Sequence, residues 1–248
     1  MLGAERLARI VRTVRDRGGA TVPELAEALG ISASTVRRDL AALDKEGRVA
    51  KVHGGAMSLE RAHVTRDLTI GERGGLHTGE KERICSRAAS LVGEAGLVYI
   101  DSGSTTLHLV DMLPPLRGVV CVTDSVGHAR RLVARGLRTI VLGGSIKPET
   151  EAVVGPDAIA TLGRYNFAIG FWGANGIDER AGLTTPDPEE AEVKRASMAR
   201  SARRVVIADA SKFGMVAPVT FAPLDGVEVL TAGEVPGPYR TRENVTVL

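Results

Sequence analysis

Hydrophobic residues near the start of the chain recur every three or four positions, which is the spacing of amphipathic helices. The apolar positions within residues 7–14 predict a first helix, and Gly18-Gly19 ends it. Pro23 opens a second predicted helix, and Gly30-Ile31-Ser32 forms the turn to a third. The pattern therefore predicts a small helical domain at this end of the chain.

The third predicted helix has two chemically different faces. Ser32 is a good N-cap residue, and the helix runs from about Ala33 to Glu46. Val36, Leu40 and Leu43 recur at spacings of four and three and form one apolar stripe. The opposite face carries small, hydroxyl-bearing and cationic side chains: Ser34, Arg37, Arg38, Ala41 and Lys45.

The polar face has the side chains with which proteins recognise duplex DNA. Serine and threonine hydroxyls reach phosphates or base edges, and the fork of an arginine matches a phosphate or the O6/N7 edge of guanine. The same pattern also occurs in solvated amphipathic helices. The helix alone therefore leaves both interpretations open.

The flanking segments favour DNA binding. Residues Arg48–Val52 alternate as a short strand and lead into His53-Gly54-Gly55-Ala56, a glycine turn suited to a β-wing. The expected order is helix, short strand, helix, turn, helix and wing, which is a winged helix-turn-helix over residues 1–57. The residues expected to contact DNA are Ser32, Ser34, Thr35, Arg37, Arg38, Lys45, Lys51, His53 and Gly54.

Composition narrows the kind of nucleic acid. Residues 1–57 hold ten lysines and arginines against seven aspartates and glutamates, whereas the whole chain of 248 residues carries a net charge of only +2. This bias suits local phosphate contacts and is too weak for a general nucleic-acid scaffold. Only 3% of the residues are aromatic, which argues against stacking platforms for single strands or RNA. Duplex DNA is the expected target.

The rest of the chain predicts a second domain of a different class. Residues 58–78 lack clear periodicity and are expected to form a linker. From Gly79 helices and strands alternate to residue 235, followed by a tail over residues 236–248. The expected strands are Leu97–Ile100, Val119–Thr123, Arg138–Leu142, Phe167–Trp172, Arg204–Ala208 and, closing the series, Val227–Thr231. They are apolar on both faces, which predicts a parallel, doubly wound, Rossmann-like α/β sheet.

The turn after the first of these strands is suited to an anion. Residues Asp101-Ser102-Gly103-Ser104-Thr105-Thr106 lead directly into a predicted helix. The glycine lets the backbone approach a ligand, and the N–H groups at the helix start, with three hydroxyls, form a cradle for a phosphate. The chain has no dinucleotide fingerprint or P-loop at this turn, so we expect no nucleotide cofactor.

Further polar residues follow the other predicted strands. Ligands bind at this edge of parallel sheets, so these residues are candidates for contacts to a phosphorylated polyol. For any one of them alone, ordinary turn chemistry is the favoured interpretation, but several at one sheet edge favour a phosphorylated polyol site. The candidates from this argument are Asp124, Ser125, Gly144, Asn175 and Lys212, in addition to residues 101–106.

Motifs in both halves resemble one known family. Thr35-Val36-Arg37-Arg38-Asp39-Leu40, followed by the His-Gly-Gly-Ala at 53–56, resembles the DeoR family of bacterial transcriptional regulators, which has isoleucine at position 36. The second half is similar to the same family through residues 101–106, 143–144, 176–178, Glu190, Lys194, Met198 and 209–212. The resemblance implies a sensor domain similar to ribose-5-phosphate isomerase that binds phosphorylated sugars. It adds Asp178 and Lys194 to the candidate ligand-binding residues.

Two residues depart from the family pattern. Asp124 stands where the family usually has asparagine, and Asn166 stands where it usually has aspartate. Asp124 lies at the expected ligand edge, where an added carboxylate opposes a phosphate unless it faces a hydroxyl or a cation. The identity of the sugar phosphate is therefore left open.

The sequence gives little indication of a metal site or of a membrane segment. His53, His63 and His77 do not have metal-ligand spacing, and Cys85 and Cys121 are expected to be small core residues, so we expect no metal site. No apolar run approaches the roughly 20 residues of a membrane span, and no signal-peptide pattern is present, so a cytoplasmic protein is expected.

The sequence thus predicts a regulator, expected to repress a sugar or polyol operon. Because a small domain reads paired half-sites only in two copies, we expect a homodimer or homotetramer on double-stranded operator DNA. An alternative is a sugar-phosphate isomerase with Asp101 or Asp178 as base and Lys212 stabilising the intermediate. A third hypothesis is a structural DNA binder with an inert second domain.

Overall fold

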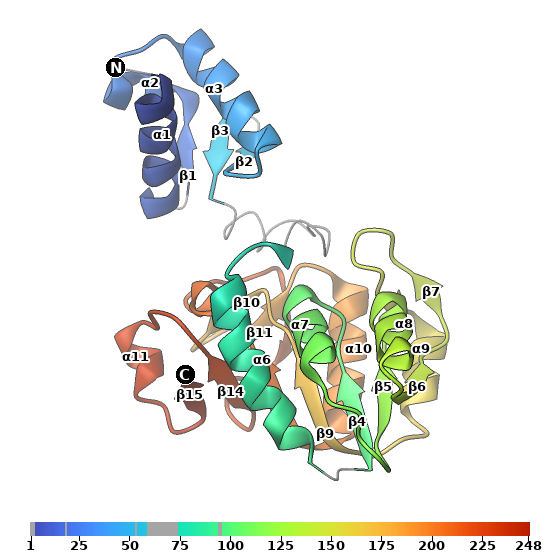
Figure 1. Cartoon of the computed structure of the whole chain (residues 1–248). Helices are drawn as coiled ribbons and strands as arrows, with labels where there is room; N and C mark the ends of the chain where they lie inside the picture. The colour runs from blue at the N-terminus through green and yellow to red at the C-terminus, as the bar shows by residue number, and fades with distance from the viewer. Residues whose placement is uncertain (1–2, 18, 53, 59–73, 94–95) are drawn as a thin grey trace. The chain divides into compact units, whose positions relative to one another are not determined.

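The computed structural model describes residues 3–17, 19–52, 54–58, 74–93 and 96–248 (Figure 1). The chain divides into two compact units, Met1–Arg66 and Asp67–Leu248. Each unit has a hydrophobic core of its own.

The first unit is a winged helix-turn-helix, as predicted. Its strands form an antiparallel sheet in the order β1-β3-β2, in which β2 and β3 are the wing. The elements are α1 (Gly3–Arg17), β1 (Gly19–Thr21), α2 (Val22–Leu29), α3 (Ala33–Lys45), β2 (Ala50–Val52) and β3 (Gly55–Met57).

Side-chain caps and a small core determine the helices of this unit. The Thr21 hydroxyl accepts from the backbone N–H of Glu24, whose carboxylate in turn accepts from the Thr21 N–H. Ser32 caps α3 by accepting from the N–H of Thr35, as expected. The predicted stripe of Val36, Leu40 and Leu43 is buried against α1 and α2 residues such as Ile10, Val14 and Leu25.

Two polar contacts hold α3 in place. The Arg6 guanidinium donates from Nε to Asp39 Oδ2 at 2.6 Å and from Nη2 to Oδ1 at 3.1 Å, which ties α1 to α3. The Lys51 N–H donates to Asp44 Oδ1 at 2.8 Å, which ties the wing to α3. Asp39 is 7% exposed, so the aspartate of the Thr-Val-Arg-Arg-Asp-Leu motif positions the helix and does not face solvent.

The second unit is built on a seven-stranded parallel sheet in the order β15-β14-β12-β9-β4-β5-β6. The strands are β4 (Leu97–Ile100), β5 (Val120–Thr123), β6 (Arg138–Val141), β9 (Phe167–Trp172), β12 (Ser201–Ile207), β14 (Glu228–Thr231) and β15 (Val245–Val247). This confirms the doubly wound α/β class. Small antiparallel additions are β7 (Ser145–Ile146) with β8 (Val153–Val154), and β10 (Gly176–Asp178) with β11 (Gly182–Thr185) and β13 (Val219–Ala222).

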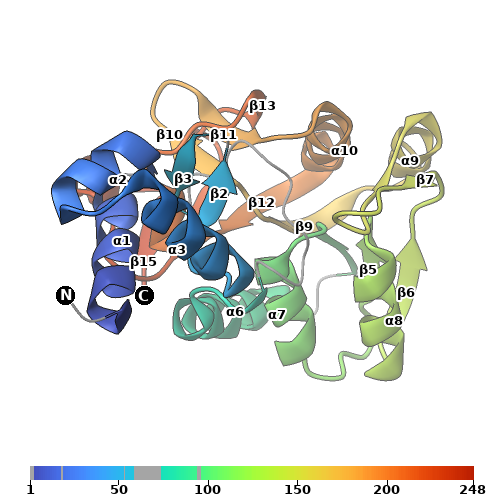
Figure 2. The same cartoon turned by 90° about the horizontal axis from the view of Figure 1, so that it is seen from above.

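Helices cover both faces of the sheet (Figure 2). α6 (Thr78–Val92), α7 (Ser104–Met112) and α8 (Val126–Ala134) lie along one face, and α9 (Pro156–Leu162) and α10 (Pro188–Ala199) lie along the other. The short η1 (Ala210–Lys212) and α11 (Gly237–Arg240) follow β12 and β14. Cys85 and Cys121 are free and buried in the core on the α6 side, as expected.

Two predictions about this unit were wrong, and one feature was missed. The strand expected at Arg204–Ala208 begins three residues earlier, because Ser201 already belongs to β12, where it pairs with Phe167. The strand at 227–231 does not close the series, because Val245–Val247 adds β15 beside β14. The hairpins were not expected at all. The hairpin strands and β15 have only two to four residues each, which is too little alternation to be recognised before their partners are known.

No helix of the described residues is long and apolar enough to cross a membrane.

Gly55 gives a direct test of the wing. A Cβ at this position would lie 2.3 Å from the carbonyl oxygen of Ala20, because β3 is the central strand of its sheet. We expect Gly55→Ala to destabilise the first unit by about 1–3 kcal/mol. Gly79→Ala, whose Cβ would have no neighbour within 4 Å, is the control.

The chain contains one tryptophan, Trp172, in β9 of the second unit. In the Gly55→Ala variant, circular dichroism should show an earlier loss of helix while the Trp172 fluorescence transition stays in place. Equal melting of the two glycine variants by circular dichroism would contradict the close approach at Gly55.

Candidate functional site

The candidate ligand site lies where the direction of strand addition reverses. From β4 the chain adds β5 and β6 on one side, then β9, β12, β14 and β15 on the other. Asp101 follows β4 and Gly173 follows β9, so these two positions flank the switch point between neighbouring strands. The Gly173 N–H donates to Asp101 Oδ2 at 3.0 Å. In open parallel sheets this is the place where ligands bind.

A buried ion pair occupies the floor of this edge. Lys194, from α10, pairs through Nζ with Asp101, and the two residues are 4% and 0% exposed. Burial opposes the charged form of Lys194, but the carboxylates of Asp101, Glu190 and Asp124 outweigh it and raise its pKa. The other carboxylate oxygen of Asp101, Oδ1, is buried without a hydrogen-bond partner among the described residues. The predicted residues Asp101 and Lys194 are thus brought together.

Asp124 lies in the same cluster. It is 2% exposed and accepts from the Ser102 N–H at 2.7 Å, with the Ser102 hydroxyl 3.2 Å from its other oxygen. Burial, and then the charge of Asp101, raise the pKa of Asp124 to about 8. The raised pKa favours the protonated, uncharged form of Asp124, which resembles the asparagine that the family usually has there. The departure noted in the sequence does not add a negative charge to the ligand edge.

The loop after β4 leads into an uncapped helix. Gly103, with φ of 149°, is the N-cap of α7, and no side chain of the described residues caps that helix by a hydrogen bond. Lys81, from α6, is 3% exposed and donates through Nζ to the Ser104 hydroxyl at 3.4 Å. Helix N–H groups and a buried lysine together form the kind of site that binds a phosphate.

The Thr106 hydroxyl is held within this loop. It donates to the Gly103 carbonyl oxygen at 3.0 Å and lies 3.2 Å from Nε2 of His128 in α8. Thr106 and His128 are 0% and 1% exposed. The loop conformation is therefore supported from beneath by a second helix.

Sequence reasoning missed Lys81, His128 and the buried position of Glu190. Lys81 continues the apolar stripe of Ile84, Cys85 and Ala88, and a lysine on a buried stripe is a detectable signal for a charged site. His128 gave no such signal, because its role depends on contact with another helix.

Several predicted residues have other tasks in the structure. The Asp178 carboxylate accepts from the N–H groups of Arg180 and Ala181 at 2.8 Å, and these bonds lower its pKa. Ser125 caps α8 by accepting from the N–H of His128. At Gly144 a Cβ would lie 2.4 Å from the Val154 carbonyl oxygen. None of these described contacts joins the Asp101 cluster.

The remaining two candidates lie at neighbouring strand ends. Asn175 accepts from the Thr185 hydroxyl at 3.3 Å. Lys212, in η1, is partly exposed. Burial of Asp209 raises the pKa of that carboxyl group, but the charge of Lys212 and other neighbours outweighs this effect, and the pKa lies below its usual value. Lys212 is therefore placed as a cation at the end of β12.

One group of metal-type ligands occurs in the described part of the chain. Single ligand atoms of His77, Glu80 and Asp209 lie within 4.8 Å of one another, a grouping that histidine spacing did not reveal. Lys212 and Lys81 act electrostatically on Asp209, and their positive charge opposes a cation at this place. The absence of a metal site stays a prediction.

The candidate DNA-contacting residues share the outer face of α3 and the wing. Ser34, Arg37, Arg38 and Lys45 are exposed, as predicted. The Ser32 hydroxyl lies 2.9 Å from the hydroxyls of Ser34 and Thr35. A hollow of about 540 Å³ between α3 and the wing is lined by residues that include Arg37, Lys51 and Gly54. His53 lies outside the described residues.

Asp124 makes stability depend on pH in a defined direction. Its pKa rises from 3.8 to about 8 on folding, so the native state holds a proton that the unfolded chain releases. This contribution is complete below about pH 4 and is lost as the pH rises to about 8, by at most about 1.4 kcal/mol per pH unit. Asp124→Asn does not titrate. We expect its stability advantage over the wild type to grow with pH across this window.

Thermal and urea unfolding at several pH values would measure this advantage. Asp157→Asn, on the exposed side of α9, is the control and should track the wild type in parallel. An Asp124→Asn advantage that is constant from pH 4 to pH 8 would mean that Asp124 is not held protonated.

Comparison with known proteins identifies both units. The DeoR-like helix-turn-helix domain matches residues 6–62, and the DeoR C terminal sensor domain matches residues 76–234. FruR, an uncharacterized HTH-type transcriptional regulator of Bacillus subtilis (strain 168), is 34% identical over 231 residues, which cover 93% of this chain and 91% of that protein. The HTH-type transcriptional regulator GlpR of Haloferax volcanii is 35% identical over 229 residues, 92% of this chain and 89% of that protein.

Solved structures show only distant likeness. Ribose 5-phosphate isomerase from Plasmodium falciparum aligns with a TM-score of 0.40 and 16% identity, over 54% of this chain and 52% of that one. The assignment therefore rests on the two domain matches and the full-length relatives. The chain belongs to the DeoR family of DNA-binding transcriptional regulators.

Proposed function

We propose that this regulator represses a sugar or polyol catabolic operon and that a phosphorylated sugar, bound at the β4/β9 switch point, controls its hold on operator DNA. The observation that carries the proposal is the uncapped N-terminus of α7 beside the buried Lys81. The positive charge of Lys81 beside the first N–H groups of α7 attracts an anion with several acceptor oxygens. A phosphate group has this chemistry.

The remainder of the switch-point edge suits the sugar. Asp101 Oδ1 is a buried acceptor, and a protonated Asp124 presents an uncharged carboxyl group. Such groups hydrogen-bond hydroxyls without repelling the attached phosphate. Lys212, at the end of β12, supplies a second cation for the phosphate.

The DNA-binding half of the proposal rests on the exposed side of α3. Arg37 and Arg38 project from the helix that a helix-turn-helix places in the major groove, while Lys51 and Gly54 belong to the wing. A homodimer or homotetramer would present two such helices to paired half-sites of operator DNA. Such a complex would act in the cytoplasm, with the chromosome.

An isomerase is a weaker interpretation of the same edge. Asp101 is fully buried and paired with Lys194, and the Asp178 carboxylate is engaged by two backbone N–H groups, so neither is poised as a general base. The relatives named above are transcriptional regulators, not enzymes.

Control of DNA binding requires that the ligand bind two arrangements of the protein with different affinities. A sugar phosphate that lowers affinity for the operator would make the chain a repressor released by its ligand. One that raises affinity would reverse the sense of control while leaving both sites in place.

Arg37→Ala and Arg38→Ala test the recognition helix. Each should weaken operator binding by about 1–3 kcal/mol if it reads a base, or reduce the salt dependence if it contacts only phosphate. Arg12→Ala, exposed on α1, is the control. Fluorescence anisotropy with labelled operator at several salt concentrations would measure both quantities. Wild-type affinity and salt slope in both variants would remove α3 from the interface.

Thr105→Ala and Lys212→Ala test the phosphate site. Neither residue contacts DNA in the proposal, so operator affinity without ligand should be unchanged, whereas the response to sugar phosphates should be lost. Thr241→Ala and Arg164→Ala, both exposed elsewhere on the second unit, are matched controls. A thermal-shift screen finds the ligand first, because one at 100 times its dissociation constant stabilises the protein by about 2.7 kcal/mol.

A full response in Thr105→Ala and Lys212→Ala would move the phosphate site elsewhere. If no sugar phosphate changed DNA affinity in the wild type, the second unit would be inert and the chain a structural DNA binder.

A further inference from the structure

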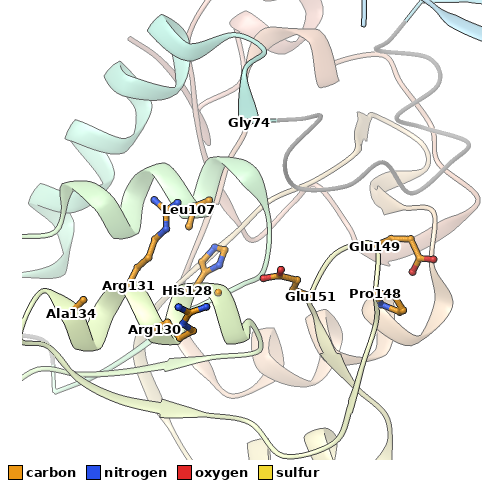
Figure 3. Close-up of a pocket in the computed structure, with 10 residues that line it drawn as sticks. Gly74, Leu107, His128, Arg130, Arg131, Ala134, Pro148, Glu149 and Glu151 are labelled. Carbon is orange, nitrogen blue, oxygen red and sulfur yellow. The ribbon is translucent and has the colours of Figure 1, made fainter. Parts of the chain in front are cut away.

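A second cavity lies next to the phosphate loop and has no role so far. Its volume is about 910 Å³, and it is formed by α7, α8 and the loop between β7 and β8 (Figure 3). The residues that matter here are Leu107 of α7, His128, Arg130 and Arg131 of α8, and Glu149 and Glu151 of the loop. Leu107 directly follows Thr106, so the cavity begins where the phosphate loop ends.

The loop that forms one wall is anchored to α10. Lys147, at its start, pairs with Asp187, and the Thr150 hydroxyl donates to Glu190 Oε1 at 2.6 Å. Thr150 is 2% exposed. The wall is therefore a built part of the unit.

His128 leaves one hydrogen-bond acceptor without a partner. The Thr106 hydroxyl donates its proton to the Gly103 carbonyl, so it accepts from an Nε2–H of His128. The second ring nitrogen, Nδ1, then carries a lone pair, and it has no hydrogen-bond partner among the described residues. Burial lowers the pKa of His128 to about 4, so the ring stays neutral at physiological pH.

Glu151 is held close to the start of α8. A Cβ on Gly127 would lie 2.7 Å from Glu151 Oε2, so this carboxylate lies directly beside the first turn of α8. In Figure 3 the Glu151 carboxylate points towards the His128 side of the cavity, and Glu149 lies farther along the loop. Glu151 adopts a positive φ of 51°, unusual for a residue with a side chain.

The charges of the lining balance. Arg130, Arg131, Glu149 and Glu151 all line the cavity, with the Glu149 carboxylate turned away from the arginines in Figure 3, and Arg131 pairs with Asp111 at 2.5 Å. A second phosphate would have to overcome two carboxylates, and an ammonium group would have to overcome two guanidinium groups. Neutral hydroxyls, which both donate and accept, fit a mixed lining of this kind.

We propose that this cavity takes the part of the effector's hydroxylated carbon chain that extends beyond the switch-point edge, with His128 Nδ1 accepting from one hydroxyl and Glu151 and Arg130 binding others. This inference rests on the proposed phosphate site. Thr106 joins the two places, because its N–H lies in the first turn of α7 and its hydroxyl contacts His128. The ligand is therefore a sugar or polyol monophosphate whose hydroxyls, beyond the phosphate, determine selectivity.

Calorimetric titration of the full chain at neutral pH tests this with three kinds of probe. Inorganic phosphate fills only the loop, hexyl phosphate adds an apolar chain, and a panel of six-carbon sugar and polyol monophosphates adds hydroxyls. We expect the best member of the panel to bind at least about tenfold more tightly than the other two probes, the equivalent of one to two hydrogen bonds.

Glu151→Gln should weaken that best ligand roughly five- to tenfold and leave inorganic phosphate unchanged, and His128→Gln should weaken the best ligand more than it weakens inorganic phosphate. Glu189→Gln, exposed on α10, is the control. The glutamine at 128 retains an N–H donor for Thr106. Glu151 is exposed, so its variant tests the cavity even if the buried histidine cannot be replaced.

The outcomes separate the two proposals. Failure of every phosphate probe to bind would refute the phosphate loop and the cavity assignment with it. Binding of phosphate with no preference for hydroxylated chains, or equal loss of all probes in the Glu151→Gln variant, would overturn the cavity assignment alone.

Discussion

The second unit depends on one buried charge, the ammonium group of Lys194. It pairs with Asp101 at the end of β4 and lies 3.4 Å from the carbonyl oxygen of Gly173 at the end of β9, so it joins α10 to the two strands that flank the switch point. A buried ion pair contributes little net stability. Removing one partner leaves the other charge buried without a counter-ion, which lowers the free energy of unfolding by about 3–5 kcal/mol. The pair therefore fixes the geometry of this edge, where the loops that would hold a ligand begin.

The same charge explains how three carboxyl groups can share the site. Asp101 neutralises Lys194 directly, Glu190 accepts from Thr150, and Asp124 keeps its proton because burial and Asp101 both oppose a further charge. An asparagine at position 124 would need no such arrangement. This chain uses a carboxyl group instead, and its neutrality depends on the neighbours.

Regular elements and the winged domain were predictable from local pattern, and the site was only partly so. The spacing of Val36, Leu40 and Leu43 predicts their helix. Residues 101–106 contain the glycine and hydroxyl groups that are typical of an anion-binding loop. The pairing of Asp101 with Lys194 joins residues 93 positions apart, and no local signal records it. Asp178 was named by resemblance, yet its carboxylate is used by a hairpin turn that the sequence did not reveal. Short strands such as Val245–Val247 form only because β14 already offers an edge.

His128 shows why part of the site could not be predicted from the sequence, since its role depends on a contact between two helices. Its buried position in α8 is set by packing, and the Ser125 cap fixes the first turn from which it projects. Once the ring is there, the hydroxyl of Thr106 determines which nitrogen carries the proton, and the other nitrogen must then be an acceptor. A buried acceptor without a partner is unfavourable by roughly 1–3 kcal/mol, and a ligand hydroxyl in the adjoining cavity would remove that cost. His128 Nδ1, the acceptor that supports a hydroxylated ligand in this cavity, is therefore a group that destabilises the protein when no ligand is bound.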